Sequence, residues 1–129
     1  MSEMSDIVIE FVHEGNDKAN QLEHHLIDLE NNPKSSELLT EAFRALHTIK
    51  GATSFLGFSK LGALAHTGES LLARLRNGAL VMNQEIASAL LSLVDAIRAI
   101  LSEIAATGNE GSADYAVLTD TLTRLHKSA

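Results

Sequence analysis

Cysteine is absent from this 129-residue sequence, and so is tryptophan. Without cysteine, neither a disulfide framework nor a thiolate zinc site can form. Proline occurs once and aromatic residues make up 4% of the chain, whereas hydrophobic residues make up 45%. A core of leucine, isoleucine, valine and alanine in a chain with a single proline is typical of helices rather than strands.

Basic residues are also scarce, since ten lysines and arginines stand against seventeen acidic residues and give a formal net charge of −7. Such a chain lacks the basic face that nucleic-acid phosphates and anionic membranes attract, so we expect neither partner. No apolar run reaches the roughly 18 residues that span a bilayer. The first ten residues are acidic rather than signal-like. We therefore expect a soluble, cytoplasmic domain.

Apolar and small residues recur at helical spacing in five segments, which we expect to form helices over residues 6–30, 36–56, 59–77, 84–106 and 113–126. No period-2 strand pattern competes with them. Four long helices joined by short loops predict an all-α, up-down-up-down four-helix bundle. The short fifth helix is expected on the outside of this bundle. The length predicts a single domain, over residues 1–129.

Polar residues at the expected helix starts predict the N-caps. Ser35 or Ser36 is the candidate for the second helix, Ser59 for the third and Asn83 for the fourth. At the end of the third helix, arginines at positions 74 and 76 are expected to balance the helix dipole.

The second helix carries a histidine, a lysine and a glycine within five residues, at His47, Lys50 and Gly51. At about 100° per residue, His47 lies roughly 140° from the centre of the apolar stripe of this helix. It shares a polar face with Gly51 and Ser54, so we expect its imidazole to face solvent. An interior glycine costs about 1 kcal/mol relative to alanine. We interpret Gly51 as clearance for a partner that docks on the face of Gly51 and Ser54.

The turn between the second and third helices sets which residues face each other. In antiparallel neighbours, residues equally distant from the turn lie at the same height. Counted from Phe58, His47 lies eleven residues back and Glu69 eleven forward. Lys50 and His66 each lie eight residues from the same point. We therefore expect Glu69 beside His47, and Lys50 with His66 in a second layer nearer the turn.

This set of side chains has a specific chemistry. A carboxylate that accepts a hydrogen bond from Nδ1–H of a histidine leaves Nε2 free and raises its basicity. A nearby lysine supplies the positive charge that phosphoryl oxygens require. Without a metal ligand set or surrounding pocket residues, the combination favours phosphoryl acceptance over proton-transfer catalysis.

Two alternatives remain open on the residues alone. The chain could be a structural or adaptor helical bundle in which His47 is passive. It could also bind a metal, because Glu10 and His13 have the E-x-x-H spacing of di-iron bundles. Those bundles need two such motifs and two further glutamates, and the sequence has one motif, so we expect no metal site.

The segments AFRALHTIKGATSFLGF, at 42–58, and HTGESLL, at 66–72, closely resemble the histidine phosphotransfer domain of the CheA family of chemotaxis kinases. The H-[ST]-[IL]-K-G and H-x-x-E blocks of that family are both intact, and the resemblance covers essentially the whole chain. It implies that His47 is phosphorylated on Nε2 and that Glu69 holds Nδ1. It also implies that Lys50 and His66 support the site, and that Gly51 allows partners to dock closely.

The resemblance further implies a phosphorelay. A phosphoryl group passes from an ATP-bound histidine kinase domain to His47, and then to an aspartate of a chemotaxis-type response-regulator receiver. The sequence has no glycine-rich nucleotide-binding block. We therefore expect no cofactor in this chain, with ATP and Mg²⁺ bound by the partner domains. The chain would be the phosphoacceptor part of a histidine protein kinase whose catalytic domain lies in the same polypeptide or another.

Overall fold

The computed structural model describes residues 5–128, so residues 1–4 and 129 of the predicted domain lie outside the described part. Its helices are α1 (Asp6–Asn31), α2 (Ser36–Leu56), α3 (Ser59–Arg76), α4 (Gln84–Thr107) and α5 (Ala116–Lys127). Residues 5–128 contain no strand, which confirms the all-α fold class. None of the helices in this range combines the length and the apolar character that crossing a membrane requires.

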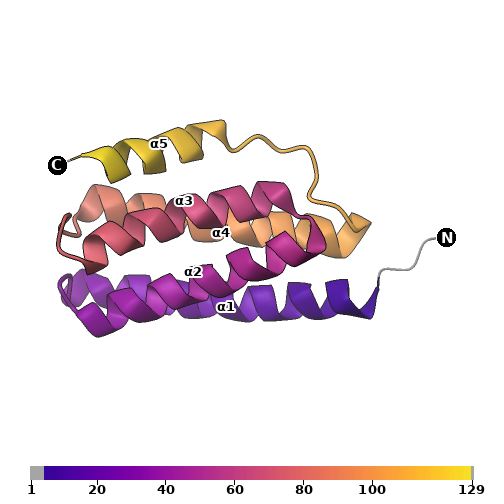
Figure 1. Cartoon of the computed structure of the whole chain (residues 1–129), viewed down its shortest axis with the longest axis horizontal. Coiled ribbons are helices and arrows are strands. Elements are labelled where there is room, and N and C mark those ends of the chain that lie inside the picture. Colours follow the sequence, from indigo (N-terminus) through magenta and orange to yellow (C-terminus); the bar gives the residue numbers. More distant parts are fainter. Residues whose placement is uncertain (1–4, 129) are drawn as a thin grey trace.

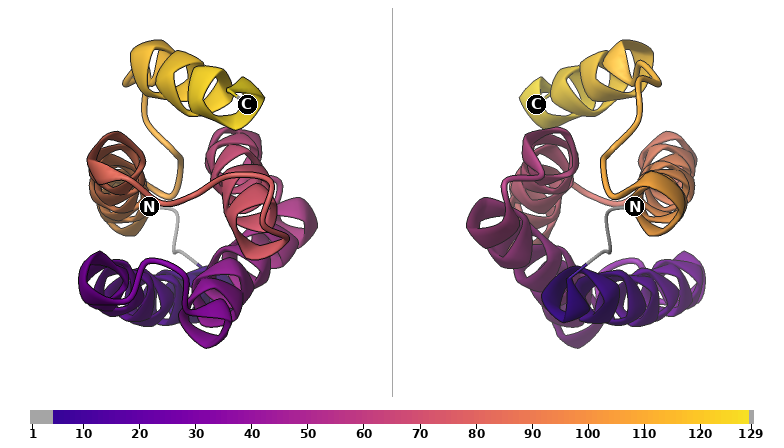
Figure 2. Two further views of the ribbon diagram at one scale, coloured as in Figure 1. Left: turned by 90° about the vertical axis from the view of Figure 1, so that its left-hand side faces the viewer. Right: turned by 90° about the vertical axis from the view of Figure 1, so that its right-hand side faces the viewer.

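The first four helices run alternately up and down and lie side by side (Figure 1). Seen along the bundle, α1 and α2 form one side, α3 and α4 the other, and α5 lies over the α3–α4 side (Figure 2). Accordingly α5 packs against both α3 and α4, while α2 contacts α1 on one side and α3 on the other. The predicted bundle with an external fifth helix is confirmed.

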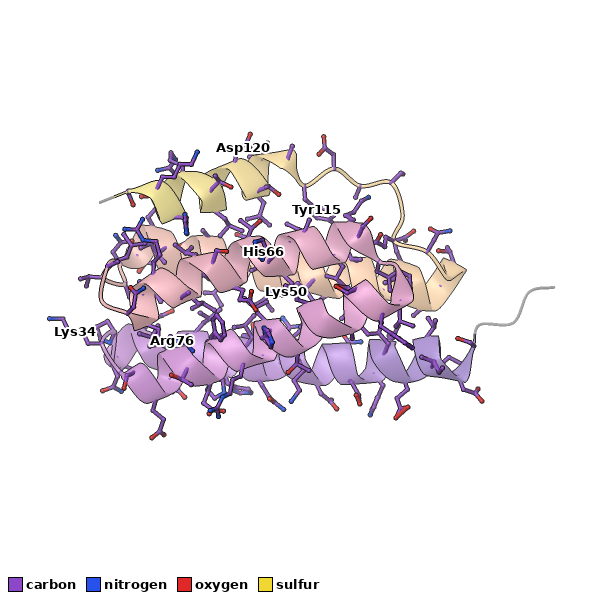
Figure 3. All side chains as sticks on the ribbon, viewed as in Figure 1. Lys34, Lys50, His66, Arg76, Tyr115 and Asp120 are labelled. Carbon is purple, nitrogen blue, oxygen red and sulfur yellow. The ribbon has the colours of Figure 1, made fainter. Side chains whose placement is uncertain are left out.

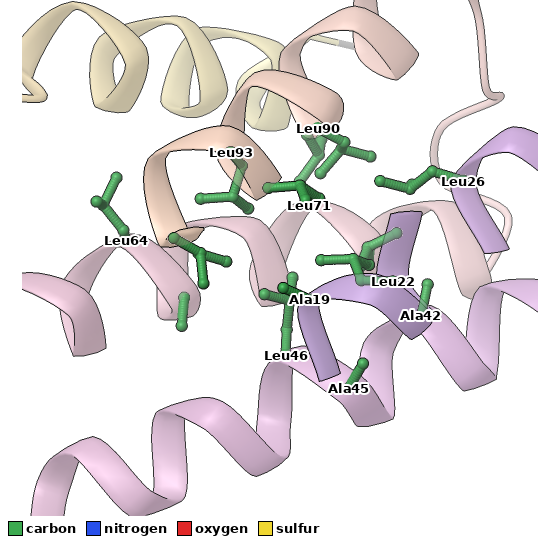
Figure 4. Close-up of a cluster of buried hydrophobic side chains, with 14 of the residues drawn as sticks. Ala19, Leu22, Leu26, Ala42, Ala45, Leu46, Leu64, Leu71, Leu90 and Leu93 are labelled. Atoms are coloured by element: carbon green, nitrogen blue, oxygen red, sulfur yellow. The ribbon is translucent and has the colours of Figure 1, made fainter. Parts of the chain in front are cut away.

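Leucines from four helices meet in the core of the bundle (Figure 4). Leu22, Leu46, Leu71 and Leu93 are each fully buried. Gly68 brings α3 close to its neighbours, because a Cβ at this position would overlap the side chain of Leu93. The same Cβ would lie 3.0 Å from the side chain of Leu46, so α3 also packs tightly against α2.

Two of the predicted caps are present. The side chain of Ser35 accepts a hydrogen bond from the Leu38 amide at 3.2 Å, which decides between the two serines proposed for α2. Asn83 accepts from the Ile86 amide at 2.9 Å at the start of α4. Gly57 ends α2 with a φ of 82°, a left-handed conformation that glycine adopts without strain.

The prediction that Ser59 caps α3 is wrong. Ser59 is the first residue of α3, and the cap is the carboxylate of Glu110 from the loop between α4 and α5. Glu110 Oε2 accepts from the Leu61 amide at 2.6 Å, and its Oε1 accepts from the Lys60 amide at 3.3 Å. A negative charge that accepts from the first amides of a helix is more favourable there than a neutral hydroxyl.

The same loop explains why α5 begins at Ala116 rather than at 113. The Nζ of Lys60 donates to the backbone carbonyls of Gly111 and Ala113, both at 2.9 Å. These bonds hold residues 111–113 against the start of α3 and engage the Ala113 carbonyl, which a helix starting at 113 would use. Asp114 then accepts from the Ala116 amide at 2.9 Å, immediately before the first turn of α5. The other helix ends lie within one residue of the predicted ones.

Candidate functional site

The site lies on the hairpin of α2 and α3, on the outer surface of the bundle. His47 points outward from α2, and 63% of its side chain is exposed. Glu69 projects from α3 at the same height, and only 8% of its side chain is exposed. Figure 3 shows Lys50 on α2 and His66 on α3 in the same region, near the middle of the bundle. The equal distances from the turn therefore place these residues together, as the sequence predicted.

Glu69 is the centre of the hydrogen-bonding network. Its Oε2 lies 2.5 Å from Nδ1 of His47, and its Oε1 accepts from Nζ of Lys50 at 2.6 Å. Nδ1 of His66 lies 3.7 Å from the same Oε1. The expectation that Lys50 and His66 form a separate second layer nearer the turn is therefore wrong. The long side chain of Lys50 reaches back one turn, so that all three groups converge on one carboxylate.

The pKa of Glu69 reflects two opposing effects. Burial raises the pKa of this carboxyl, but the hydrogen bonds from Lys50 and His47, together with the charge of the Lys50 ammonium, outweigh burial and hold it below its usual value of 4.5. A carboxyl whose pKa is lowered by folding stabilises the folded state above its unfolded pKa. That contribution is lost only as the pH falls below about 4.5, through the lowered value. At neutral pH, Glu69 is therefore an ionised acceptor.

An ionised Glu69 fixes the tautomer of His47. A carboxylate can only accept, so the Nδ1 that faces it carries the proton. The second ring nitrogen, Nε2, is then the one with the free electron pair. The hydrogen bond from Nδ1–H to a carboxylate also stabilises positive charge that develops on the ring when Nε2 attacks an electrophile. The geometry thus provides an exposed, oriented nitrogen nucleophile.

The two flanks of the imidazole differ. One turn beyond His47, a Cβ on Gly51 would meet nothing within 4 Å, and Gly51 and Ser54 are both exposed. One turn before it, the Phe43 ring stacks on the imidazole, with centroids 6.0 Å apart and planes 11° from parallel. The open flank fits the predicted docking role of Gly51 and Ser54, which stays a prediction. Phe43 was not predicted as part of the site, although its four-residue spacing from His47 could have identified it.

The residues considered for a metal do not converge. His13 lies 3.8 Å from Asp17, one turn along the exposed face of α1. Within residues 5–128, no three histidine, aspartate or glutamate side chains are placed to hold a metal ion together. Glu69 is itself paired with Lys50, a cation that would compete with a metal for the same oxygens.

Comparison with known proteins agrees with this geometry. The model of the Hpt domain family matches residues 6–100. The sensor histidine kinase CheAY of Helicobacter pylori is 34% identical over 110 residues, which are 85% of this chain and 14% of that protein. The chemotaxis protein CheA of Halobacterium salinarum is 37% identical over 106 residues, or 82% of this chain and 16% of that protein. The chain thus spans about a sixth or less of these relatives.

Two solved structures share the whole fold. The phosphorylated P1 domain of CheA3, in complex with CheY6 from R. sphaeroides, superposes with a TM-score of 0.87 at 29% identity. That match covers 95% of this chain and 97% of the other. A solution structure of the histidine phosphotransfer domain of CheA gives a TM-score of 0.87 at 32% identity, and covers 98% of this chain and 96% of the other.

Proposed function

The chain belongs to the Hpt domain family, and from that premise we propose that it is the phosphoacceptor domain of a chemotaxis-type histidine kinase. In this proposal, Nε2 of His47 receives a phosphoryl group from an ATP-bound kinase domain. His47 then passes the group to an aspartate of a response-regulator receiver. The observation that carries the proposal is the 2.5 Å contact between Nδ1 of His47 and Glu69, on an imidazole that is otherwise exposed.

Each transfer forms one bond to phosphorus as another bond to phosphorus breaks. The electron pair of Nε2 forms a bond to the γ-phosphorus as the bond between that phosphorus and the β–γ bridging oxygen breaks, which releases ADP. The ring keeps its Nδ1 proton and gains positive charge, which the carboxylate of Glu69 offsets across the 2.5 Å contact. In the second transfer, a carboxylate oxygen of the receiver bonds to phosphorus and the N–P bond breaks. The imidazole returns to its neutral form.

The partners of this chain follow from the same proposal. The CheA3 P1 domain, which shares this fold, was solved in complex with CheY6, which supports a receiver of that type as the acceptor. We propose that ATP and Mg²⁺ are bound by the kinase and receiver domains, and that the relay operates in the cytoplasm. The chain is then one part of a phosphotransferase. The alternative of a passive adaptor bundle loses its support, because the family match and the paired His47 and Glu69 both favour phosphotransfer.

Substitutions at Gly51 test this function and its docking face together. We expect Gly51→Ala to raise the free energy of unfolding by up to about 1 kcal/mol, because the added methyl group meets open space in a helix interior. Gly51→Leu should slow transfer from phosphorylated His47 to a CheY-type receiver by roughly tenfold or more, because the longer side chain keeps the partner from its reactive distance. Rapid-quench measurement of labelled phosphate on both proteins gives the rate.

The matched control is Ala99→Leu, which adds the same side chain at an exposed position of α4. This variant should transfer phosphate as fast as the parent. Parent-like transfer by Gly51→Leu would show that partners do not approach over this flank. Failure of the parent chain to pass phosphate to any receiver of a broad panel would contradict the proposed function itself.

A further inference from the structure

The positive charge of Lys50 is paired with Glu69, on the Nδ1 side of the His47 imidazole. Its Nζ donates at 2.6 Å to the same carboxylate that holds Nδ1 of His47. The other nitrogen, Nε2, faces away from that carboxylate. A phosphoryl group on Nε2 brings close to two negative charges and three acceptor oxygens to the outer side. Because Lys50 is already paired with Glu69, most of the negative charge of the phosphoryl group would have no partner.

A second cation lies on the outer surface of the same hairpin. The guanidinium carbon of Arg76 sits 4.2 Å from the centroid of the Phe43 ring, and that ring stacks on His47. Helical side chains lean toward the N-terminus of their own helix, and the N-terminus of α3 lies at the turn beyond His47. The side chain of Arg76 therefore extends from the last turn of α3 back toward the level of His47. Figure 3 shows Arg76 at the facing surfaces of α2 and α3.

Arg76 differs from the other arginines in what its hydrogen-bond donors contact. Each of the others donates to an oxygen: Arg44 to Glu41, Arg74 to the carbonyl of His126, Arg98 to Glu23 and Arg124 to Glu85. Within residues 5–128, no oxygen accepts from Arg76, whose contact is with an aromatic face instead. A cation–π contact holds a guanidinium in place and leaves its N–H edge free.

We propose that Arg76 is a phosphoryl-binding residue of this site, and that Phe43 positions it there. This inference rests on the proposed phosphorylation of His47. Once the phosphoryl group is on Nε2, the guanidinium donates to its oxygens with the two-pronged geometry that arginine offers to phosphate. The Phe43 ring contacts both the guanidinium and the imidazole, and it leaves the donors of the guanidinium unoccupied. The position of Arg76 in the last turn of α3 agrees with the predicted balancing of the helix dipole, and the proposed role in the site is additional to it.

The experiment is a ³¹P NMR titration of the phosphorylated chain. A cation beside the phosphoryl group favours its dianion, so the second pKa of the phosphoryl group should rise when the cation is removed. We expect Arg76→Gln to raise this pKa by about 0.3 to 1 unit, for a charge at several ångströms near the surface. Arg76→Lys should restore part of the shift, because it keeps the charge. Phe43→Leu should give a smaller shift in the same direction.

Arg124→Gln is the matched control, because it removes an arginine that pairs with Glu85 between α5 and α4. Its phosphoryl pKa should equal that of the parent. A role of Arg76 in stability alone would lower the unfolding midpoint of Arg76→Gln and leave the phosphoryl pKa unchanged. An unchanged pKa in that variant would overturn the inference, while labelling of His47 in the same samples would keep the proposed function intact.

The proposed function can also fail while the inference on Arg76 holds. If the kinase domain leaves His47 unlabelled, the proposed function fails. Phosphoramidate, a small donor that transfers its phosphoryl group to imidazole and releases ammonia, then loads the exposed ring without any kinase. The His47 signal is the one missing from His47→Gln. The same comparison of parent and Arg76→Gln decides the inference on Arg76.

Discussion

His47→Gln should carry no acid-labile, alkali-stable phosphate after incubation with the cognate kinase domain and ATP, whereas the parent chain is labelled. The reason is chemical, since an amide has no basic nitrogen to attack phosphorus. The imidazole is largely exposed, so the substitution should change the free energy of unfolding by no more than about 1 kcal/mol, the size of one hydrogen bond. Loss of label in a folded variant, checked by circular dichroism, is the expected result.

His13→Gln provides the control for this experiment. His13 lies on the exposed face of α1, where it contacts Asp17 rather than the network around Glu69. This variant should be labelled at the same rate as the parent. Acid-labile label that persists in His47→Gln would place the phosphoryl group on another residue and contradict the assignment.

Removal of the orienting carboxylate has the second large effect. In Glu69→Ala, nothing fixes the Nδ1 proton of His47, so the ring turns freely and samples both tautomers. Loss of the carboxylate that orients a metal-binding histidine typically costs about 10-fold to 100-fold in affinity or activity, and by analogy we expect a decrease of this size in the rate of labelling. Lys50 also loses its partner, but 29% of its side chain is exposed and the ammonium can turn to water. The helical fold should therefore be retained.

Glu23→Ala is matched to this variant, because it also removes a glutamate that pairs with a cation on a neighbouring helix. Glu23 accepts from Arg98 of α4 at 2.8 Å, on the side of the bundle formed by α1 and α4. Its rate of labelling should equal that of the parent. Labelling of Glu69→Ala at the parent rate would show that the carboxylate does not orient the ring.

The pairing of His47 with Glu69 could be predicted from sequence, because the position of the turn in a helical hairpin determines which residues lie at the same height. Gly57 fixes the turn, and the antiparallel packing of α2 and α3 then brings Glu69 to the height of His47. The same counting did not show that Lys50 and His66 also reach Glu69. Counting gives the height of a Cα atom, whereas the reach of a lysine side chain spans more than one turn.

The wrong predictions, on the cap of α3 and the start of α5, concern contacts whose two residues lie far apart in the sequence. Ser59 has the residue type and position of a cap, but Glu110 lies about fifty residues away and takes that role. Local preference cannot anticipate a carboxylate that a later loop delivers. The same loop delays the start of α5, through the bonds of Lys60.

The contact of Arg76 with Phe43 could be predicted from the sequence only in part. Height alone places Arg76 well beyond the level of His47, near the end of α3. Only the lean of helical side chains toward the N-terminus brings the guanidinium back over the Phe43 ring. A sequence reading that included this lean, in addition to position, could have found the contact.

The decisive measurement is which ring nitrogen of His47 carries the phosphoryl group. NMR correlation of ³¹P with the ring protons and nitrogens of the phosphorylated chain distinguishes Nε2 from Nδ1. Since Glu69 holds Nδ1–H at 2.5 Å, the phosphorus should be bonded to Nε2 of His47, with the Nδ1 proton still present. Phosphorus bonded to Nδ1, or to any histidine other than His47, would show that Glu69 does not direct phosphorylation to Nε2 of His47.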